Sequence, residues 1–404
     1  MNQQNKMAGR IDYGIILTLM LLCLISLISI YSAQITNAQY DTNFVMKQIV
    51  WYVVTTFAII VMMQLDYDRL TKWAYYYYAL GIFLLIFVLV FGKEVKGAKS
   101  WIIIPFLGSL QPSEVVKVII IIVLAKVIMD HNNKFKVHTI KYDFWLIVKI
   151  GLFAAVPLVL IMLQPDLGTT LVFIAIIAGM ILVSGISWKI IVPLYGGIIA
   201  IGTAAIWMVI NHQSWLIKIG FKPYQFDRIT TWINPETDPQ GGGYQVLRAM
   251  TAIGSGQISG NGAGYDAIAI PENHNDFIFT IIGGDYGFIG ASILLALYFL
   301  LIYQIIRVAL DINIPYYSYI CTGVVMMIMF HVLENVGMNI GLLPITGIPL
   351  PFISYGGSAL LGNMMAIGLI LSIRFNYQNQ CLKWIARQYK AESIWFSFFF
   401  CFRI

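Results

Sequence analysis

The sequence predicts an all-α, polytopic integral membrane protein with about ten transmembrane helices. Of its 404 residues, 59% are hydrophobic and 11% are charged, and the mean hydropathy is +0.79. Apolar runs near twenty residues long recur along the chain, which is the length that a helix needs to cross a bilayer. A soluble enzyme could not bury all of these runs as core helices.

The edges of the apolar runs define ten expected spans. They are 13–32, 45–64, 73–91, 114–129, 144–162, 167–184, 190–210, 277–306, 317–338 and 358–373. The first run is longer than a cleaved signal usually carries, which favours an uncleaved first span. The whole chain, residues 1–404, is expected to form one transmembrane domain with an N-terminal tail, 1–12, and a C-terminal tail, 375–404.

Lysine and arginine residues collect on one side of these spans, and that side is expected to be cytoplasmic. Both termini fall on it, and residues 211–276 fall outside. Lys93, Lys96 and Lys99 depart from the rule in a short outer loop, which indicates a role with an anion there. The net charge of +6 is spread along the chain without a basic run, so no nucleic-acid partner is expected. The four cysteines have no metal or disulfide spacing.

Two irregular segments interrupt the apolar pattern. Residues 211–276 are rich in glycine but also contain aromatic residues, so they predict a folded outer loop rather than a disordered one. Residues 341–357, with the sequence GLLPITGIPLPFISYGG, place three prolines in an apolar region. Backbone without internal hydrogen bonds cannot face lipid, so this broken or re-entrant segment must be buried in protein or line a cavity.

Glu114 and Lys117 open the fourth span three residues apart, on one helical face where they can pair. The pair could be purely structural, or it could present Lys117 to a phosphate with Glu114 as support. Pro112 and Ser113 suit a helix start, with Ser113 as the cap.

Other polar residues leave similar alternatives open. Asp166 could cap the sixth span or bind a ligand. Glu334 lies inside the ninth span beside Asn335 and near Asn339, where an acid has either a functional or a packing role. His331 in the same span is typical of a hydrogen-bonded core histidine.

Asp276 ends the polar outer loop and begins an apolar helix, at the depth where a lipid head group reacts. A simple helix-capping role is the alternative for this carboxylate. Gln245 follows three glycines, which let backbone approach a ligand closely.

These residues lie in motifs that resemble the SEDS family (shape, elongation, division and sporulation), the polytopic peptidoglycan glycosyltransferases. The resemblance covers the first span to about Arg374, and Thr346–Phe352 is similar to the elongation branch of the family. The motifs, in order, are GAKSW (97–101), QPSEVVK (111–117), QPDLGT (164–169), INPETDPQGGGYQ (233–245), AIGSG (252–256), PENHNDFIF (271–279) and ENVGMNIGLLPITGIPLPFISYGGS (334–358).

The resemblance implies a bacterial plasma-membrane enzyme that polymerises lipid II, the undecaprenyl-pyrophosphate-linked disaccharide pentapeptide, into β-1,4 glycan during cell-wall elongation and cell-shape maintenance. Asp276 is the catalytic residue it implies, with a divalent cation, Mg²⁺ or Mn²⁺, as cofactor. The implied partner is a class B penicillin-binding protein with transpeptidase activity, in addition to membrane lipid. The candidate substrate-binding residues are Glu114, Lys117, Lys99, Trp101, Gln111, Asp166, Gln245, Glu272, His274, Asn339 and Ser354.

Three alternatives remain at this point. A lipid II flippase or other transporter would depend on Glu334, the Glu114–Lys117 pair and the broken segment. A division or sporulation paralogue would share the polymerase chemistry. A non-catalytic scaffold would tolerate loss of all these groups.

Overall fold

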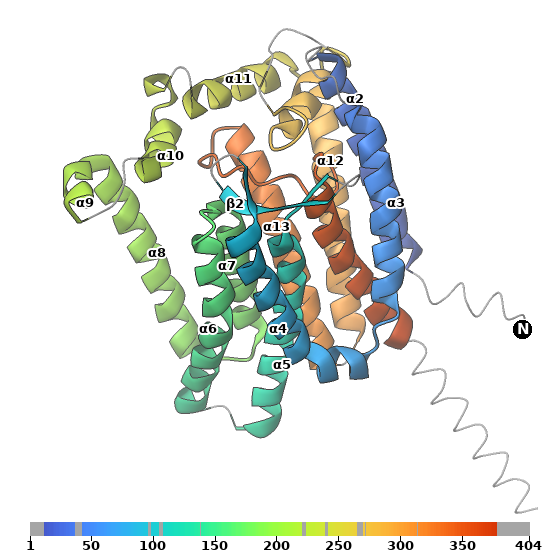
Figure 1. Ribbon diagram of the computed structural model, residues 1–404, viewed down its shortest axis with the longest axis vertical. Helices are drawn as coiled ribbons and strands as arrows, with labels where there is room; N and C mark the ends of the chain where they lie inside the picture. Colours follow the sequence, from blue (N-terminus) through green and yellow to red (C-terminus); the bar gives the residue numbers. More distant parts are fainter. Residues whose placement is uncertain are drawn as a thin grey trace, which may run out of the picture.

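The computed structural model describes residues 12–36, 43–95, 98–104, 108–137, 139–219, 224–238, 241–264, 270, 272–312 and 314–377. Within these ranges it is a bundle of long helices with shorter helices over one end (Figure 1). Among the described residues, eight helices are long and apolar enough to cross a membrane. This confirms an all-α polytopic membrane protein. The expected tails lie almost entirely outside the described residues.

Each of the ten expected spans coincides with a helix. In chain order these are α2 (Tyr13–Thr36), α3 (Phe44–Met63), α4 (Tyr67–Phe91), α5 (Pro112–Lys134), α6 (Ile140–Met162), α7 (Leu167–Val183), α8 (Trp188–Asn211), α12 (Ile278–Asp311), α13 (Pro315–Asn339) and the last helix, Gly357–Tyr377. Several begin earlier than expected because polar residues cap them. In α4, for example, the Asp66 side chain accepts from the Arg69 N–H at 3.0 Å.

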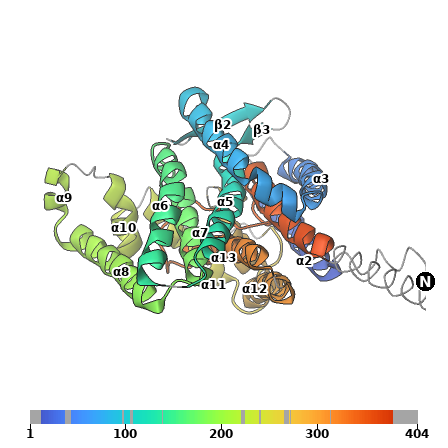
Figure 2. The ribbon, with the colours of Figure 1, turned by 90° about the horizontal axis from the view of Figure 1, so that it is seen from below.

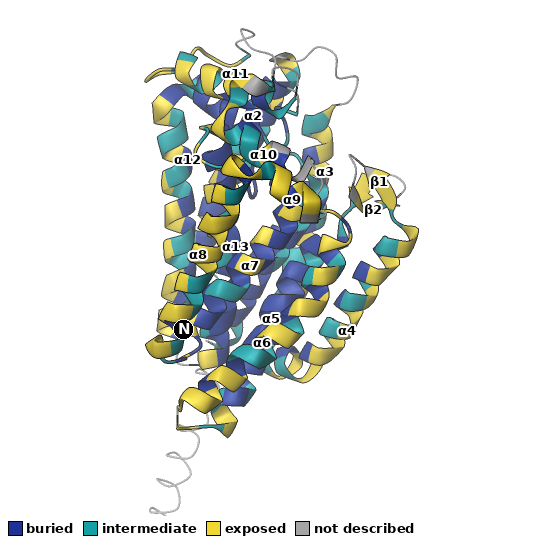
Figure 3. Cartoon of the chain, turned by 90° about the vertical axis from the view of Figure 1, so that its left-hand side faces the viewer, coloured by how far each residue is buried: buried dark blue, intermediate teal, exposed yellow. Residues whose placement is uncertain are grey.

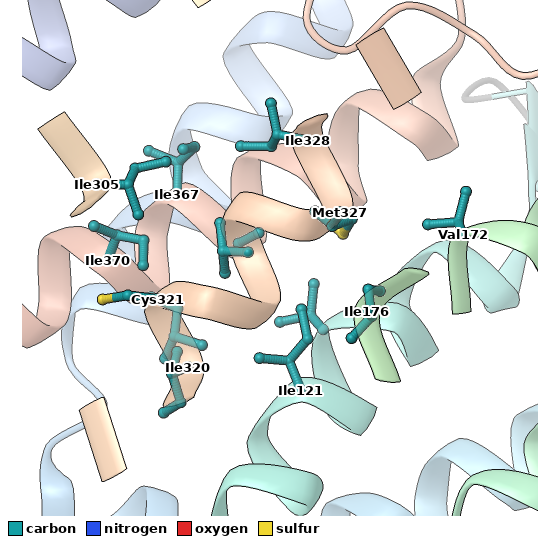
Figure 4. Packing of buried hydrophobic residues seen from close by; sticks show 14 of the residues in the cluster. Ile121, Val172, Ile176, Ile305, Ile320, Cys321, Met327, Ile328, Ile367 and Ile370 are labelled. Carbon is teal, nitrogen blue, oxygen red and sulfur yellow. The ribbon is translucent and has the colours of Figure 1, made fainter. Parts of the chain in front are cut away.

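α5 lies in the middle of the bundle and is buried on nearly every side (Figures 2 and 3). Its Ile121 packs in one apolar cluster with Ile176 of α7 and Met327 of α13 (Figure 4). By contrast, α8 at the edge of the bundle buries only Ile191 and Val209. An apolar helix that is exposed in this way needs lipid around it.

A small antiparallel sheet joins α4 to α5, which the sequence analysis did not predict. Its strands are β1 (Lys93–Val95), β2 (Ala98–Ile104) and β3 (Gly108–Leu110), in that order. β2 ends in three consecutive isoleucines, which favour extended backbone. Gly108, with φ +96°, takes a conformation that glycine adopts without strain.

The described residues between 211 and 276 are folded, as expected. They form α9 (Gln213–Ile219), α10 (Tyr224–Ile233), a 3₁₀ turn η1 (Pro235–Thr237) and α11 (Gly242–Ser255). Ala249 of α11 is buried against Ile270 and Phe277. The indole N–H of Trp232 donates to the carbonyl of Gly341 at 3.1 Å. The segment therefore packs onto the residues around Asp276 and onto the start of segment 341–357.

Residues 256–262 fill a kink in α12. Gly287 breaks the helix with φ 62° and ψ −160°. The N–H groups of Phe288 and Ile289 donate instead to the carbonyls of Gln257 and Ile258, at 2.9 and 3.2 Å. A Cβ atom at Gly260 would come within 2.1 Å of the Asp285 carbonyl oxygen. Only glycine permits so close an approach.

Five carbonyl groups of segment 341–357 accept hydrogen bonds from side chains of four helices. Ser26 of α2 donates to Ile353 at 2.7 Å, and Tyr52 of α3 donates to Phe352 at 2.5 Å. Further donors are Gln48 of α3 to Ser354, Tyr298 of α12 to Pro351 and Asn335 of α13 to Ile348. The irregular backbone is thus held by protein side chains, as the argument from lipid exposure requires.

The two ends of the described chain meet at the end of the bundle away from α11. The Arg374 guanidinium lies 3.4 Å from the Asp12 carboxylate and 2.8 Å from that of Asp311. This cluster ties the start of α2 to the ends of α12 and of the last helix. The start of α12, with Asp276 beside it, lies at the opposite end.

Candidate functional site

Asp276 stands just before α12, and its side chain is half-buried. Phe277 occupies the N-cap position of α12, so Asp276 lies one residue before the cap. The alternative in which Asp276 is the N-cap of this helix is therefore wrong. Asp276 thus lies at the junction between the outer loop, residues 211–276, and α12.

Two asparagines of α13 hold the backbone of Asp276. Nδ2 of Asn335 donates to the Asp276 carbonyl at 2.7 Å, and Nδ2 of Asn339 donates to the same oxygen at 3.2 Å. Both asparagines are fully buried, with an exposed fraction of 0%. Asn339, a candidate substrate-binding residue, thus anchors the backbone of the residue that carries the carboxylate.

Gly347 lies beside the Asp276 side chain. A Cβ atom on Gly347 would be 3.5 Å from Oδ2 of Asp276, and Gly347 has φ +73°. Gly347 is exposed. The carboxylate is thus bordered by an exposed part of segment 341–357 that has no side chain.

The residues before Asp276 are also fastened to segment 341–357. The Ser354 hydroxyl donates to the Asn275 carbonyl at 2.6 Å, and the Tyr355 N–H donates to the His274 carbonyl at 2.9 Å. The His274 ring stacks on Phe44 of α3 with centroids 4.2 Å apart. Ser354 and His274, both candidate substrate-binding residues, therefore fix the shape of the loop.

Glu114 and Lys117 form a buried ion pair, as expected, with 2.7 Å between Lys117 Nζ and Glu114 Oε2 and exposed fractions of 5% and 1%. The Lys117 ammonium also lies 3.0 Å from Nε2 of His331. Nδ1 of His331 lies 2.6 Å from the Met327 carbonyl. Because a carbonyl only accepts, Nδ1 carries the proton and Nε2 accepts from Lys117.

The start of α5 differs from the expectation. Ser113 is not the cap, because the helix begins one residue earlier, at Pro112, and Gln111 occupies the N-cap position without a side-chain capping bond. The Gln111 amide instead donates to the Asp166 carboxylate at 2.6 Å. Asp166 caps α7 by accepting from the Thr169 N–H at 3.0 Å. The QPSEVVK and QPDLGT motifs thus meet at the first turns of two helices.

Four candidate residues lie elsewhere in the described part of the chain. Lys99 of β2 donates to the Val90 carbonyl at 2.9 Å, where it satisfies the last turn of α4. Trp101, also on β2, is half-buried, as is Gln245 in the first turn of α11. Glu272, with φ +59°, begins the turn that leads to Asp276.

The site therefore offers one carboxylate, on a residue whose backbone carbonyl is held by neutral hydrogen-bond donors. Among the residues that the structure describes, no three His, Cys, Asp or Glu side chains gather as a metal cage. Mg²⁺ ions in phosphate-transfer sites commonly use one or two carboxylates together with substrate phosphates. Asp276 fits that donor set, whereas a closed protein cage is not present in the described part of the chain.

Sequence reasoning missed the contacts of His331, Asn335 and Gly347. His331, Asn335 and Asn339 are spaced four residues apart, so they share one face of α13. That spacing was readable from the sequence. The partners, Lys117 and the carbonyl of Asp276, were not, because they come from distant parts of the chain.

A family model described as Cell cycle protein, FtsW/RodA/SpoVE, matches residues 13–379. The probable peptidoglycan glycosyltransferase FtsW of Thiomicrospira cyclica is 34% identical over 77% of this chain and 76% of its own length. The peptidoglycan glycosyltransferase RodA of Treponema pallidum is 30% identical over 90% of this chain and 97% of its own.

A similar chain is found in a solved structure, which is described as showing the structural coordination of polymerization and crosslinking by a peptidoglycan synthase complex. It superposes with a TM-score of 0.74 and 26% identity, covering 90% of this chain and 97% of that one. The similarity thus spans nearly the full length of both chains.

Proposed function

Because the chain belongs to the FtsW/RodA/SpoVE family of cell cycle proteins, we propose that it is a peptidoglycan glycosyltransferase with Asp276 as its general base. Relatives in two branches of the family carry that activity in their names. The observation that carries the residue assignment is the anchored carboxylate of Asp276, half-buried beside exposed Gly347.

The reaction needs one base. Asp276 takes the proton from the C4 hydroxyl of the acceptor sugar as that oxygen attacks the anomeric carbon of the donor. A new C–O bond forms, and the bond between the anomeric carbon and the pyrophosphate breaks, its electron pair leaving with the pyrophosphate. Inversion at that carbon gives a β-1,4 linkage. Unlike a glycosidase, which protonates an alkoxide leaving group, this enzyme needs positive charge near the pyrophosphate.

Two lysines and a divalent cation are the candidate sources of that charge. Lys117 is closed off by Glu114 and His331, so direct contact with phosphate requires this buried pair to open. Lys99 is exposed but is engaged with Val90. A divalent cation, Mg²⁺ or Mn²⁺, bound by the pyrophosphate and Asp276, would supply charge neutralisation. Chelation with EDTA should abolish activity, and either cation should restore it.

The substrate and partner follow from the same proposal. We propose lipid II as donor and acceptor, a class B penicillin-binding protein as the crosslinking partner, and cytoplasmic termini. The similar chain from a peptidoglycan synthase complex supports a partnered enzyme. The motif from Thr346 to Phe352 favours a role in cell-wall elongation over one in division. Overall sequence identity does not separate the two roles, since it is 34% to a relative named FtsW and 30% to one named RodA.

The test is glycan synthesis from lipid II by purified protein, with and without a class B partner. Asp276→Asn keeps the shape of the side chain but removes the proton acceptor. We expect the variant to fold and to lose about two to four orders of magnitude in rate. Near-normal polymerisation by Asp276→Asn would move the base elsewhere. Lipid II translocation without polymerisation would support the flippase alternative.

A further inference from the structure

We propose that Asn335 is a positioning residue that sets the place of Asp276 for catalysis. The inference rests on the proposed function, since it assigns Asn335 a role toward the general base. The geometry behind it is a clamp, defined here as Asn335 with the two carbonyl groups that its amide holds, those of Asp276 and Ile348.

The clamp uses the full donor capacity of one side chain. Nδ2 of Asn335 lies 2.7 Å from the Asp276 carbonyl oxygen and 2.8 Å from that of Ile348. A side-chain amide has two N–H hydrogens, so both are engaged. They join a residue 59 positions earlier to one 13 positions later. Asn339 supports the clamp by donating to the Asn335 carbonyl at 2.7 Å.

The clamp determines what lies next to the carboxylate. Ile348 follows Gly347, the residue whose Cβ position is 3.5 Å from Oδ2 of Asp276. By holding the Asp276 and Ile348 carbonyls on one amide, Asn335 fixes the distance between the base and the exposed edge of segment 341–357. A substrate group that reaches Oδ2 from the side of Gly347 would cross that edge.

The helix that carries the clamp, α13, is also hydrogen-bonded to α5, the most buried of the described helices. One turn before Asn335, His331 accepts from Lys117 of α5 at 3.0 Å. α13 is therefore fixed to α5 by a buried charge-assisted hydrogen bond and to the Asp276 loop by neutral ones. This arrangement transmits the rigidity of the core to a loop residue, which catalysis requires because a displacement of about 1 Å can cost about 100-fold in rate.

The test compares Asn335→Ala with Asn132→Ala. Asn132 serves as the control, because its Nδ2 also makes two hydrogen bonds, which are partly buried, to the Ser184 carbonyl at 2.9 Å and to the Tyr319 hydroxyl at 3.1 Å. It lies near the far end of α5, away from Asp276. We expect Asn335→Ala to lower kcat for lipid II polymerisation about 10- to 100-fold with KM nearly unchanged. Asn132→Ala should keep kcat within about twofold of wild type.

A third variant separates lost donors from lost packing. Asn335→Asp keeps the side-chain shape but faces the two carbonyls with an acceptor oxygen. It should be as slow as Asn335→Ala. If Asn335→Asp restores wild-type kcat, the role is one of packing and the clamp is overturned.

Hydrogen exchange gives a readout that does not depend on activity. Backbone amides of residues 272–278 should exchange faster in Asn335→Ala and not in Asn132→Ala. Equal exchange in both variants overturns the clamp whatever the chemistry. Equal kcat in both, with Asp276→Asn inactive, overturns the positioning role and leaves the proposed function intact. Full activity of Asp276→Asn would instead refute the proposed base.

Discussion

His331 on α13 accepts a hydrogen bond from Lys117 on α5 across 3.0 Å, although 214 positions separate them in the chain. The Lys117 ammonium thereby contacts both the Glu114 carboxylate on its own helix and the His331 imidazole on another. Its charge is buried and shared within the core. Any change at Lys117 therefore acts on the packing of α5 against α13 before it acts on a ligand.

Replacing Lys117 should first lower the amount of folded protein. Lys117→Ala leaves the Glu114 carboxylate buried without its counter-ion, and breaking such a pair typically costs about 3–5 kcal/mol. We expect a strong loss of protein from the membrane fraction, measured by immunoblot and by fluorescence-detected size exclusion.

The double variant Glu114→Gln with Lys117→Met decides whether Lys117 also contacts substrate. It removes both charges together, so no ion remains buried alone. A structural role predicts that membrane level and polymerisation recover together. Recovered protein that stays inactive would assign Lys117 to the pyrophosphate.

Gly347→Ala should slow polymerisation through its effect on Asp276. The new methyl group would touch Oδ2 at 3.5 Å and crowd the approach of the acceptor hydroxyl. We expect kcat/KM to fall at least about tenfold. Gly108→Ala is the control, since φ is +96° there and a Cβ would meet nothing within 4 Å. Both substitutions carry a backbone cost of about 1–2 kcal/mol, so equal activities would contradict crowding of the carboxylate.

Asp166 offers a test of capping against substrate binding. Asp166→Ala removes the cap of α7 and the acceptor for Gln111, and a lost cap typically costs about 0.5–2 kcal/mol. Asp166→Asn keeps a good capping oxygen. A capping role predicts a lower melting temperature for Asp166→Ala and nearly wild-type stability and activity for Asp166→Asn. A stable but inactive Asp166→Asn would point to substrate contact.

The proposed topology places the two ends of the bundle on opposite sides of the membrane. Ala263, in the outer loop after α11, and Asn133, near the end of α5, are both exposed. We would place a single cysteine at each position in a protein whose native cysteines are replaced by serine. The two proteins should then differ in whether a membrane-impermeant maleimide labels them. Only the Ala263→Cys protein should label in intact cells. Labelling of both would refute the orientation.

The helices could be predicted from the sequence because each corresponds to a separate run of apolar residues, most of them long enough to cross a bilayer. The requirement that segment 341–357 be held by protein also followed from composition, since backbone in lipid has no other donors. The identities of those donors, such as Ser26 and Tyr52, did not follow. They depend on how α2 and α3 pack against a segment three hundred residues away.

The sheet and the clamp show where local reasoning failed. β2 reads as part of a short connection, and its pairing with β1 and β3 depends on register rather than hydropathy. The sequence placed Asn335 beside Glu334 in the ninth span and made His331 typical of a hydrogen-bonded core histidine, without a partner for either. Their roles depend on Asp276 and Lys117, which only the folded chain brings to them.

The kink at Gly287 has a consequence for biosynthesis. Until residues 256–262 dock, the N–H groups of Phe288 and Ile289 have no carbonyl partner, and an unsatisfied group in lipid costs several kcal/mol. If α12 enters the bilayer already kinked at Gly287, we expect its insertion to be coupled to docking of the preceding loop. A bulky residue at Gly260, as in Gly260→Val, should prevent docking. Newly made chains of that variant should then be degraded rapidly, which a pulse-chase experiment would measure. A long-lived Gly260→Val protein would show that the helix inserts independently.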